Sequence, residues 1–214
     1  AARDQNDLAF QNAQVYLHFG FVCRQPSKPR APDKRGVWTM WDIRPERAED
    51  AGAIEVLNAA SFGPGRFAKS AYRLRDGVSC ETALSFVAIE DNILRGSIRF
   101  WPVSVGGVPT LLLGPLAVQS DQRGRGIGIS LMNRGIEEAR KRGHTAIILV
   151  GDAPYYARVG FAPIAPGRIR FPGPVNPARI LGLALNGTPL ENLTGDVRRP
   201  HIDNPVCADS TALA

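Results

Sequence analysis

The spacing of apolar and polar positions predicts that strands and helices alternate along most of the chain. Residues 37–43 alternate loosely and are rich in β-forming types, which predicts a first strand. Pro45 suits the first turn of a helix in which apolar residues recur at helical spacing, and we expect this helix to end before Gly63. A second helix is predicted over residues 66–75, where apolar residues again share one side.

The next segments have the pattern of an antiparallel meander. They cover residues 83–90, 93–103 and 108–118, and each is rich in apolar and β-branched types. Asp91–Asn92 joins the first two segments and Gly106–Gly107 joins the second to the third, and both dipeptides are typical of tight hairpin turns. Consecutive strands are therefore expected to pair with each other.

The third of these strands is apolar on both faces, which predicts a central position in the sheet, yet Gly114–Pro115 interrupts it. Because proline cannot donate to a sheet ladder, we expect a bulge or a splayed strand there. An amphipathic helix over residues 126–142 then leads to a buried strand over residues 145–150. A helical crossover of this kind predicts that this strand runs parallel to residues 111–118. Beyond residue 163, where proline and glycine are frequent, only short strands and loops are expected.

Composition restricts the class of protein. The chain has 214 residues, which suits one domain, and 44% of them are apolar. No apolar run approaches the ~18 residues of a membrane-spanning helix, which argues against an integral membrane protein. Cys23, Cys80 and Cys207 are far apart, which argues against a disulfide framework and a zinc ribbon. We expect a cytoplasmic protein, because unpaired cysteines suit a reducing compartment and the first residues lack the apolar core of an export signal.

The net charge of +6 is unevenly distributed along the chain. Residues 1–35 hold six Lys or Arg and three Asp or Glu, and this proline-containing segment is typical of a flexible basic leader. A solvated leader with no specific nucleic-acid partner is the simpler interpretation, because aromatic residues are not interleaved with the basic ones. Nucleic-acid binding by the leader stays the alternative. We therefore expect a leader over residues 1–35, one domain over residues 36–200 and a tail over residues 201–214.

A glycine-rich loop, Arg123-Gly124-Arg125-Gly126-Ile127-Gly128, lies between a predicted strand and an amphipathic helix. Glycines let the backbone approach a bulky anion, and the unpaired amide groups of a first helical turn point outward at the positive end of the dipole. Such a corner binds phosphate or diphosphate. The letters fit neither G-x-G-x-x-G nor Gly-Lys-Ser/Thr, which excludes a dinucleotide-binding fingerprint and a P-loop. A turn whose glycines serve only packing stays the alternative.

Three motifs follow one another along the chain: LGPLAV at residues 113–118, Arg-x-x-Gly-x-Gly at residues 123–128, and YYARVGF at residues 155–161. Together they resemble the GNAT superfamily of acetyl-CoA-dependent N-acetyltransferases and, within it, the bacterial YhbS-like branch. The resemblance covers residues 38–199. It implies an α/β GNAT fold with a mixed, mostly antiparallel sheet, a splayed central strand pair and flanking helices.

The resemblance also implies the reaction and the site that binds the acyl donor. An acetyl group passes from acetyl-CoA to a primary amine of a small molecule, peptide or protein by direct attack in a ternary complex, and no metal is implied. The splayed strand holds the pantetheine arm, and the glycine corner holds the diphosphate. The implied cofactor-binding residues are Leu116, Ala117, Val118, Arg123, Gly124, Arg125, Gly126, Ile127 and Gly128. A non-catalytic acyl-CoA sensor or interaction module stays the alternative.

In this family, a tyrosine four residues before a Gly-Phe pair usually acts as the general acid that protonates the departing thiolate. The resemblance assigns this role to Tyr156, which precedes Gly160–Phe161. Tyr155 points about 100° away on the short helix predicted over residues 154–158, so only one of the two tyrosines is expected to face the sulfur. A core aromatic whose hydroxyl bonds a backbone carbonyl stays the alternative for Tyr156.

The residue that takes the proton of the amine is not fixed by the sequence. Glu81, Glu90 and Asp152 lie at the ends of predicted strands and are candidates. A chain of water molecules is an alternative to all of them.

Acceptor recognition in this family comes mostly from the first helices and the C-terminal strands. Arg66, Lys69 and Arg73 are therefore candidates for contact with an anionic acceptor, and a solvated helix face is the simpler interpretation of the same charges. The identity of the amine and the oligomeric state stay open, a homodimer being one option.

Overall fold

The computed structural model describes residues 41–68, 70–187 and 189–200. The predicted leader over residues 1–35 and the predicted tail over residues 201–214 lie outside these ranges, and so does Lys69. In the described part of the chain, no helix is both long enough and apolar enough to cross a membrane.

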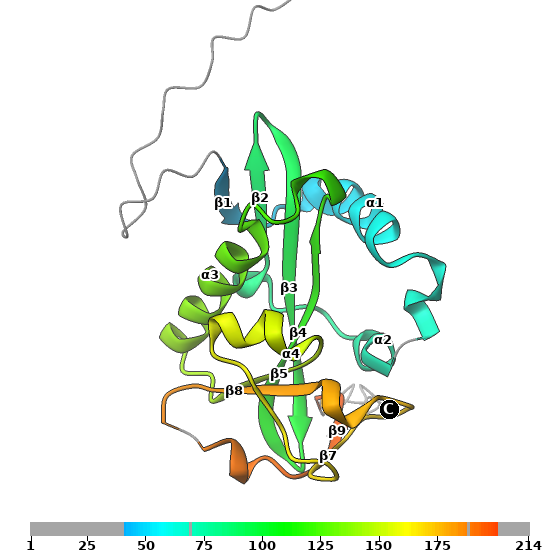
Figure 1. The fold of residues 1–214 in the computed structure, drawn as a ribbon, viewed down its shortest axis with the longest axis vertical. Coiled ribbons are helices and arrows are strands. Elements are labelled where there is room, and N and C mark those ends of the chain that lie inside the picture. The colour runs from blue at the N-terminus through cyan, green and yellow to red at the C-terminus, as the bar shows by residue number, and fades with distance from the viewer. Residues whose placement is uncertain (1–40, 69, 188, 201–214) are drawn as a thin grey trace, which may run out of the picture. The chain divides into compact units, whose positions relative to one another are not determined.

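The strands form a mixed sheet in the order β1-β2-β3-β4-β5-β8-β6, with β9 beside β3 and β7 (Figure 1). The β4–β5 and β7–β9 pairs are parallel, and the other pairs are antiparallel. This sheet confirms the predicted α/β fold with a mostly antiparallel sheet. The strands are β1 (Asp42–Pro45), β2 (Phe86–Glu90), β3 (Ile93–Val105), β4 (Val108–Val118), β5 (Ala146–Val150), β6 (Ala162–Pro163), β7 (Ile169–Arg170), β8 (Ile180–Ala184) and β9 (Gly195–Arg198).

Two tight hairpins join β2, β3 and β4, as the sequence predicts. Asp91 and Asn92 have positive φ values of 50° and 60° in the first turn, and Gly106 and Gly107 have values of 55° and 91° in the second. A two-residue hairpin requires this left-handed backbone, which Asn, Asp and Gly adopt at the lowest cost. The turns therefore fix the register of the meander.

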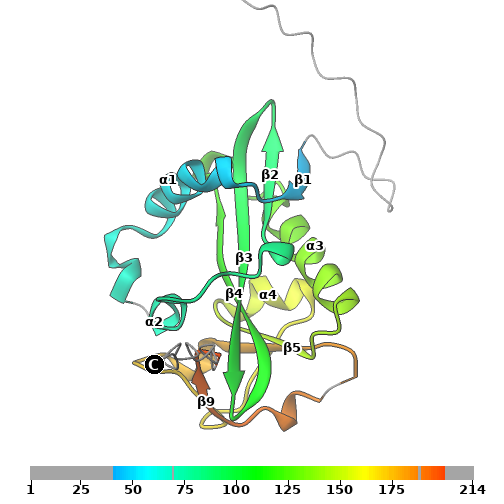
Figure 2. The ribbon, with the colours of Figure 1, turned by 180° about the vertical axis from the view of Figure 1, so that it is seen from behind.

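Helices cover both faces of the sheet. Figures 1 and 2 show α1 and α2 on one side of β3 and β4, with α3 on the other side. The predicted crossover helix is confirmed as α3, which joins β4 to the parallel strand β5. The helices are α1 (Ala51–Phe62), α2 (Ser70–Arg75), α3 (Ile127–Lys141) and α4 (Ala153–Tyr156).

Two clusters of buried side chains hold these layers together. One cluster lies between α3 and the sheet, where the Phe100 ring of β3 rests on Gly135 of α3. A Cβ at Gly135 would lie 2.4 Å from that ring, so the glycine lets helix and strand approach closely. The second cluster contains Leu74 of α2 and Leu112 of β4. Each fully buried side chain of this size contributes roughly 1.5–3 kcal/mol to the free energy of folding.

The central strands β4 and β5 separate soon after they meet. Within the described strands, the pairs that join them are Leu111–Ile147 and Leu112–Ile148. Strand β4 continues to Val118, and its register against β3 shifts at Gly114–Pro115, where no residue pair is formed. The predicted interruption is therefore confirmed as a splay, because the later part of β4 has no partner on the β5 side.

The first helix begins later than the sequence predicts. Pro45 is the last residue of β1, and the α-helix starts at Ala51 after a 3-10 turn. The Asp50 carboxylate accepts hydrogen bonds from the Arg44 guanidinium at 2.7 and 2.8 Å and from the backbone N–H of Arg47 at 2.8 Å. These bonds fasten the helix start to β1 and keep the residues between them out of the helix.

Candidate functional site

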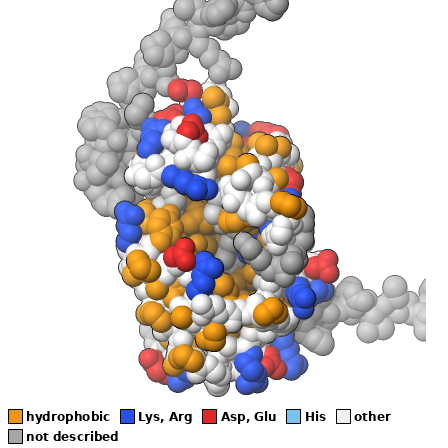
Figure 3. Space-filling view, turned by 45° about the vertical axis from the view of Figure 1, so that its right-hand side comes forward, with side chains coloured by type: hydrophobic (Ala, Val, Ile, Leu, Met, Phe, Trp, Pro, Cys, Tyr) orange, Lys and Arg blue, Asp and Glu red, His pale blue; other side chains and the backbone are white. Residues whose placement is uncertain are grey.

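Two neighbouring cavities beside the part of β4 that β5 leaves unpaired share side chains. The first, named the glycine-loop cavity, is lined by the later residues of β4, the loop before α3 and the first turn of α3. The second, named the arginine cavity, lies between α1, α2, the break in β4 and residues 174–179, and has a volume of about 310 Å³. Phe62, Leu116 and Tyr156 line both cavities, which therefore meet at these side chains. Figure 3 shows a hollow with hydrophobic side chains inside it and Lys or Arg side chains around it.

The glycine-loop cavity brings together most of the predicted cofactor-binding residues. Gly124 and Gly126 have φ values of 82° and 94°, so the loop folds in a conformation that other residues resist. Gly126 is the N-cap of α3, and the first amide groups of that helix have no intrahelical partner. A diphosphate is the kind of anion that such amides and the helix dipole bind. The predicted residues that line this cavity are Leu116, Ala117, Val118, Arg123, Gly124, Gly126, Ile127 and Gly128.

Arg125 belongs to the loop but does not line this cavity. Its guanidinium donates hydrogen bonds to the Glu90 carboxylate at 2.7 and 3.0 Å and lies over the Trp41 ring. Arg125 holds the pKa of the buried Glu90 below its usual range. The Arg125 side chain therefore fastens the glycine loop to the end of β2.

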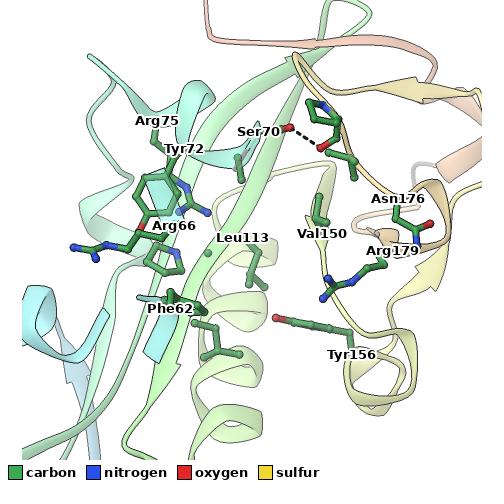
Figure 4. Close-up of a pocket in the computed structure, with 16 residues that line it drawn as sticks. Phe62, Arg66, Ser70, Tyr72, Arg75, Leu113, Val150, Tyr156, Asn176 and Arg179 are labelled. Atoms are coloured by element: carbon green, nitrogen blue, oxygen red, sulfur yellow. Dashed lines mark hydrogen bonds between the residues drawn. The ribbon is translucent and has the colours of Figure 1, made fainter. Parts of the chain in front are cut away.

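Tyr156 extends from the end of α4 into the arginine cavity (Figure 4). Its ring rests on Gly151, where a Cβ would lie 2.2 Å from the ring, and it meets Phe161 edge to face at 5.9 Å. Burial raises the pKa of Tyr156 to about 12, with Tyr155 and Asp152 acting in the same direction. The phenol therefore keeps its proton at neutral pH and is able to donate it.

Tyr155 occupies a different place from its neighbour. The two rings are nearly perpendicular, at 87°, with centroids 5.2 Å apart. The Tyr155 hydroxyl lies against Gly128 in the first turn of α3, where a Cβ would approach it to 2.2 Å. Tyr155 lines the glycine-loop cavity but not the arginine cavity, which agrees with the expectation that the two tyrosines point apart.

The arginine cavity has a positively charged wall. Arg66, Arg75 and Arg179 line it, and none of its described lining residues is Asp, Glu or His. Arg66 pairs with Glu55, and Arg179 pairs with Asp152 at 3.0 Å. A site of this kind favours ligands with negative charge and gives no carboxylate for proton abstraction.

The predicted acceptor residues are only partly brought together. Arg66 is buried and lines the arginine cavity, whereas Arg73 is exposed, does not line it, and donates a hydrogen bond to the carbonyl of Pro172 at 3.2 Å. Lys69 lies outside the described residues. The sequence did not predict Arg75 and Arg179 as site residues. The basic run before residue 76 indicated Arg75 only weakly, and no signal indicated Arg179.

The candidate bases lie away from the arginine cavity. Glu90 is buried at the end of β2 with Arg125 and with Arg95, which lies at 3.3 Å. Asp152 lines the glycine-loop cavity and pairs with Arg179, and Glu81 lines neither of the two cavities. None of these carboxylates is among the described residues that line the arginine cavity.

Comparisons with known proteins agree with this arrangement. The chain matches the model of the acetyltransferase (GNAT) family over residues 52–161. It is 34% identical over 154 residues to the uncharacterized N-acetyltransferase YhbS of Escherichia coli (strain K12), covering 68% of this chain and 90% of that protein.

Solved structures show the same likeness. A crystal structure of YhbS from Escherichia coli in complex with CoA has a TM-score of 0.63 and 31% identity, covering 75% of this chain and 89% of that one. A GNAT family acetyltransferase from Brucella melitensis in complex with acetyl-CoA has a TM-score of 0.56 and 31% identity, covering 74% of this chain and 94% of that one. The fold, the family model and these relatives agree, and the chain belongs to the GNAT family of acetyltransferases.

Proposed function

We propose that this chain transfers an acetyl group from acetyl-CoA to a primary amine, with the donor in the glycine-loop cavity and the acceptor in the arginine cavity. Membership of the family confirms the predicted enzyme class, an acetyl-CoA-dependent N-acetyltransferase. The observation that carries the placement is the splay of β4 from β5 beside the glycine corner. It leaves backbone groups of β4 unpaired at the cavity and places α3 amides at its far end.

The residues of the glycine-loop cavity fit coenzyme A in chemistry. Residues Leu116 to Val118 pair with β3 on one edge of β4, and the backbone groups on the other edge, which β5 leaves unpaired, suit the amides of the pantetheine arm. The backbone amides of residues 124–128 suit the diphosphate. The Arg123 side chain adds positive charge at the same end, whereas Arg125 contributes through its backbone and through the bond to Glu90.

Tyr156 is the proposed general acid because it lies where the two cavities meet. When bound, acetyl-CoA supplies a thioester whose carbonyl carbon is attacked by the amine, so that a C–N bond replaces the C–S bond. Tyr156 holds its proton on Oη and donates it to the departing sulfur, and water returns a proton to Oη. None of the described residues forms a hydrogen bond with the Tyr156 hydroxyl. This favours the role of general acid over that of a core aromatic bonded to a backbone carbonyl.

The acceptor amine gives up its proton without a carboxylate partner in this proposal. The described wall of the arginine cavity has no acidic residue, so none of its described side chains is a carboxylate base for the amine. Water that enters the cavity then carries the proton away.

The proposed function is tested by calorimetric titration with acetyl-CoA and by thiol release over a panel of primary amines. We expect saturable binding and acceptor-dependent thiol release. Binding without release for any amine, peptide or polyamine would contradict the transferase and favour an acyl-CoA sensor. Absence of binding at millimolar acetyl-CoA would contradict both.

A bacterial cytoplasmic location belongs to the same proposal. The bacterial origin of the similar proteins supports it, and so does the absence of paired cysteine spacing in the sequence.

A further inference from the structure

Arg75 is held in the wall of the arginine cavity without a carboxylate partner. Its side chain is part-buried, and its buried Nε has no hydrogen-bond partner among the described residues. Two aromatic rings lie near it, with the guanidinium carbon 5.0 Å from the centre of the Tyr72 ring and 5.8 Å from that of Trp101. Rings of this kind attract a cation but do not neutralise it.

The other arginines in this region are neutralised. Arg66 and Arg179 in the same wall have their ion pairs with Glu55 and Asp152. Arg99, whose charge acts on Arg75, donates a hydrogen bond to Glu46 at 2.8 Å. Burial of an unpaired charge destabilises a fold, so an unneutralised guanidinium in a cavity wall has a cost that the fold alone does not explain.

Arg75 also keeps its charge at neutral pH. Burial lowers the pKa of Arg75 to about 10, and the nearby Arg99 acts in the same direction. This value lies well above neutral pH, so the cavity wall carries a full positive charge.

The break in β4 makes room for this guanidinium. Gly114 has a φ of 129°, and a Cβ there would lie 2.9 Å from Arg75 Nη2. The Gly114 carbonyl accepts a hydrogen bond from Trp101 Nε1 at 2.6 Å. Figure 4 shows Arg75 and Tyr156 on opposite sides of the cavity, with Leu113 between them.

We propose that Arg75 binds a carboxylate on the acceptor, so that the preferred acceptor is a small primary amine that also carries a carboxylate. This inference rests on the proposed function and deepens it. A guanidinium binds a carboxylate through two parallel hydrogen bonds, and a bound carboxylate would supply the missing counter-charge. Arg75 on one wall and Tyr156 on the other then place the two ends of the acceptor, with its amine toward Tyr156.

The first test compares pairs of amines in which a carboxylate is replaced by an amide, such as glycine with glycinamide and β-alanine with its amide. Thiol release from acetyl-CoA is expected to have a kcat/KM about 10- to 100-fold higher for the carboxylate of each pair. Arg75→Gln is expected to remove this preference through KM while leaving acetyl-CoA affinity unchanged. Arg75→Lys keeps the charge but not the two-pronged geometry and is expected to keep part of the preference.

Arg140→Gln is the matched control, because it makes the same charge change at an exposed position of α3 that lines neither cavity. It is expected to leave the preference intact. Equal use of carboxylate and amide by the wild type, or the same loss for both in Arg75→Gln, would overturn the inference.

A binding measurement keeps the inference separate from the proposed function. Protein saturated with coenzyme A is heated with acetate, propionate or succinate, and with the matching amides, at constant ionic strength. Carboxylates are expected to raise the Tm more than amides in the wild type but not in Arg75→Gln. If no amine is acetylated, the proposed function fails, while this difference in Tm still decides whether Arg75 binds a carboxylate. No difference in Tm would overturn the inference even where acetyl transfer is observed.

Discussion

At the residue scale, the hydroxyl of Tyr156 is the group whose removal separates chemistry from binding. We expect Tyr156→Phe to lower kcat about 100-fold, because the thiolate then leaves without its proton donor. The dissociation constant of acetyl-CoA should change little, since the ring still packs on Gly151 and Phe161. Single-turnover kinetics and calorimetry measure the two effects separately.

Tyr155→Phe is the companion variant to this experiment. The Tyr155 hydroxyl lies at the first turn of α3 and outside the arginine cavity, so its removal should affect acetyl-CoA affinity more than kcat. A larger loss of kcat in Tyr155→Phe than in Tyr156→Phe would exchange the proposed roles of the two residues.

The raised pKa of Tyr156 predicts the pH dependence of the reaction. Burial moves this pKa from the ordinary 10 to about 12, so the acid form persists to higher pH than in an exposed tyrosine. The rate of thiol release at saturating acetyl-CoA should therefore rise from about pH 7 to about pH 10 as the acceptor amine loses its proton. If this rate instead begins to fall below about pH 9 in the wild type but not in Tyr156→Phe, the result would contradict the assignment of Tyr156 as a phenol that stays protonated in this range.

At the element scale, the start of α1 depends on one carboxylate. Asp50→Asn should lower the free energy of unfolding by about 1–3 kcal/mol near pH 7, since Asp50 accepts three short hydrogen bonds from Arg44 and Arg47. Arg44 and the Arg47 backbone hold the pKa of Asp50 below its usual range. This contribution is therefore present above about pH 4 and is lost as the pH falls through the lowered value.

Denaturant unfolding near pH 7 and near pH 3 measures this difference. Glu49→Gln is the control in the same 3-10 turn, because Glu49 is exposed and its pair with Arg47, at 3.3 Å, is exposed as well. The control should change the free energy of unfolding by less than about 0.5 kcal/mol. Equal effects of the two variants, or an Asp50→Asn effect that grows at low pH, would contradict this account.

Elements whose signals are local in sequence were predicted closely, and elements set by distant contacts were not. The β2–β4 hairpins and α3 follow from turn residues and periodicity. The helix predicted over residues 66–75 is instead a 3-10 turn followed by α2 from Ser70, with Lys69 outside the described residues. The Ser70 hydroxyl donates a hydrogen bond to the carbonyl of Pro174, a contact between segments far apart in sequence that periodicity does not contain.

At the scale of the whole molecule, the glycine-loop cavity could be predicted from the sequence, whereas the arginine cavity could be predicted only in part. The glycine-loop cavity is built mostly from residues 116–129, so a contiguous motif predicts it. The arginine cavity collects side chains from α1, α2, β4, β5, α4 and residues 174–179. Which of its arginines lacks a partner depends on where Glu55 and Asp152 lie in the fold, and the sequence alone does not give those positions.

Donor binding should stabilise the whole fold, because the glycine-loop cavity joins β4, α3 and α4. Coenzyme A at about 100 times its dissociation constant adds about 2.7 kcal/mol to the free energy of unfolding, which for a domain of this size raises the Tm by roughly 5–10 °C. Pantetheine, which lacks the diphosphate, should at the same concentration raise the Tm much less, since the α3 amides and Arg123 then gain no anion. A calorimetric scan with each ligand makes the comparison, and equal shifts would show that the glycine corner does not bind the diphosphate.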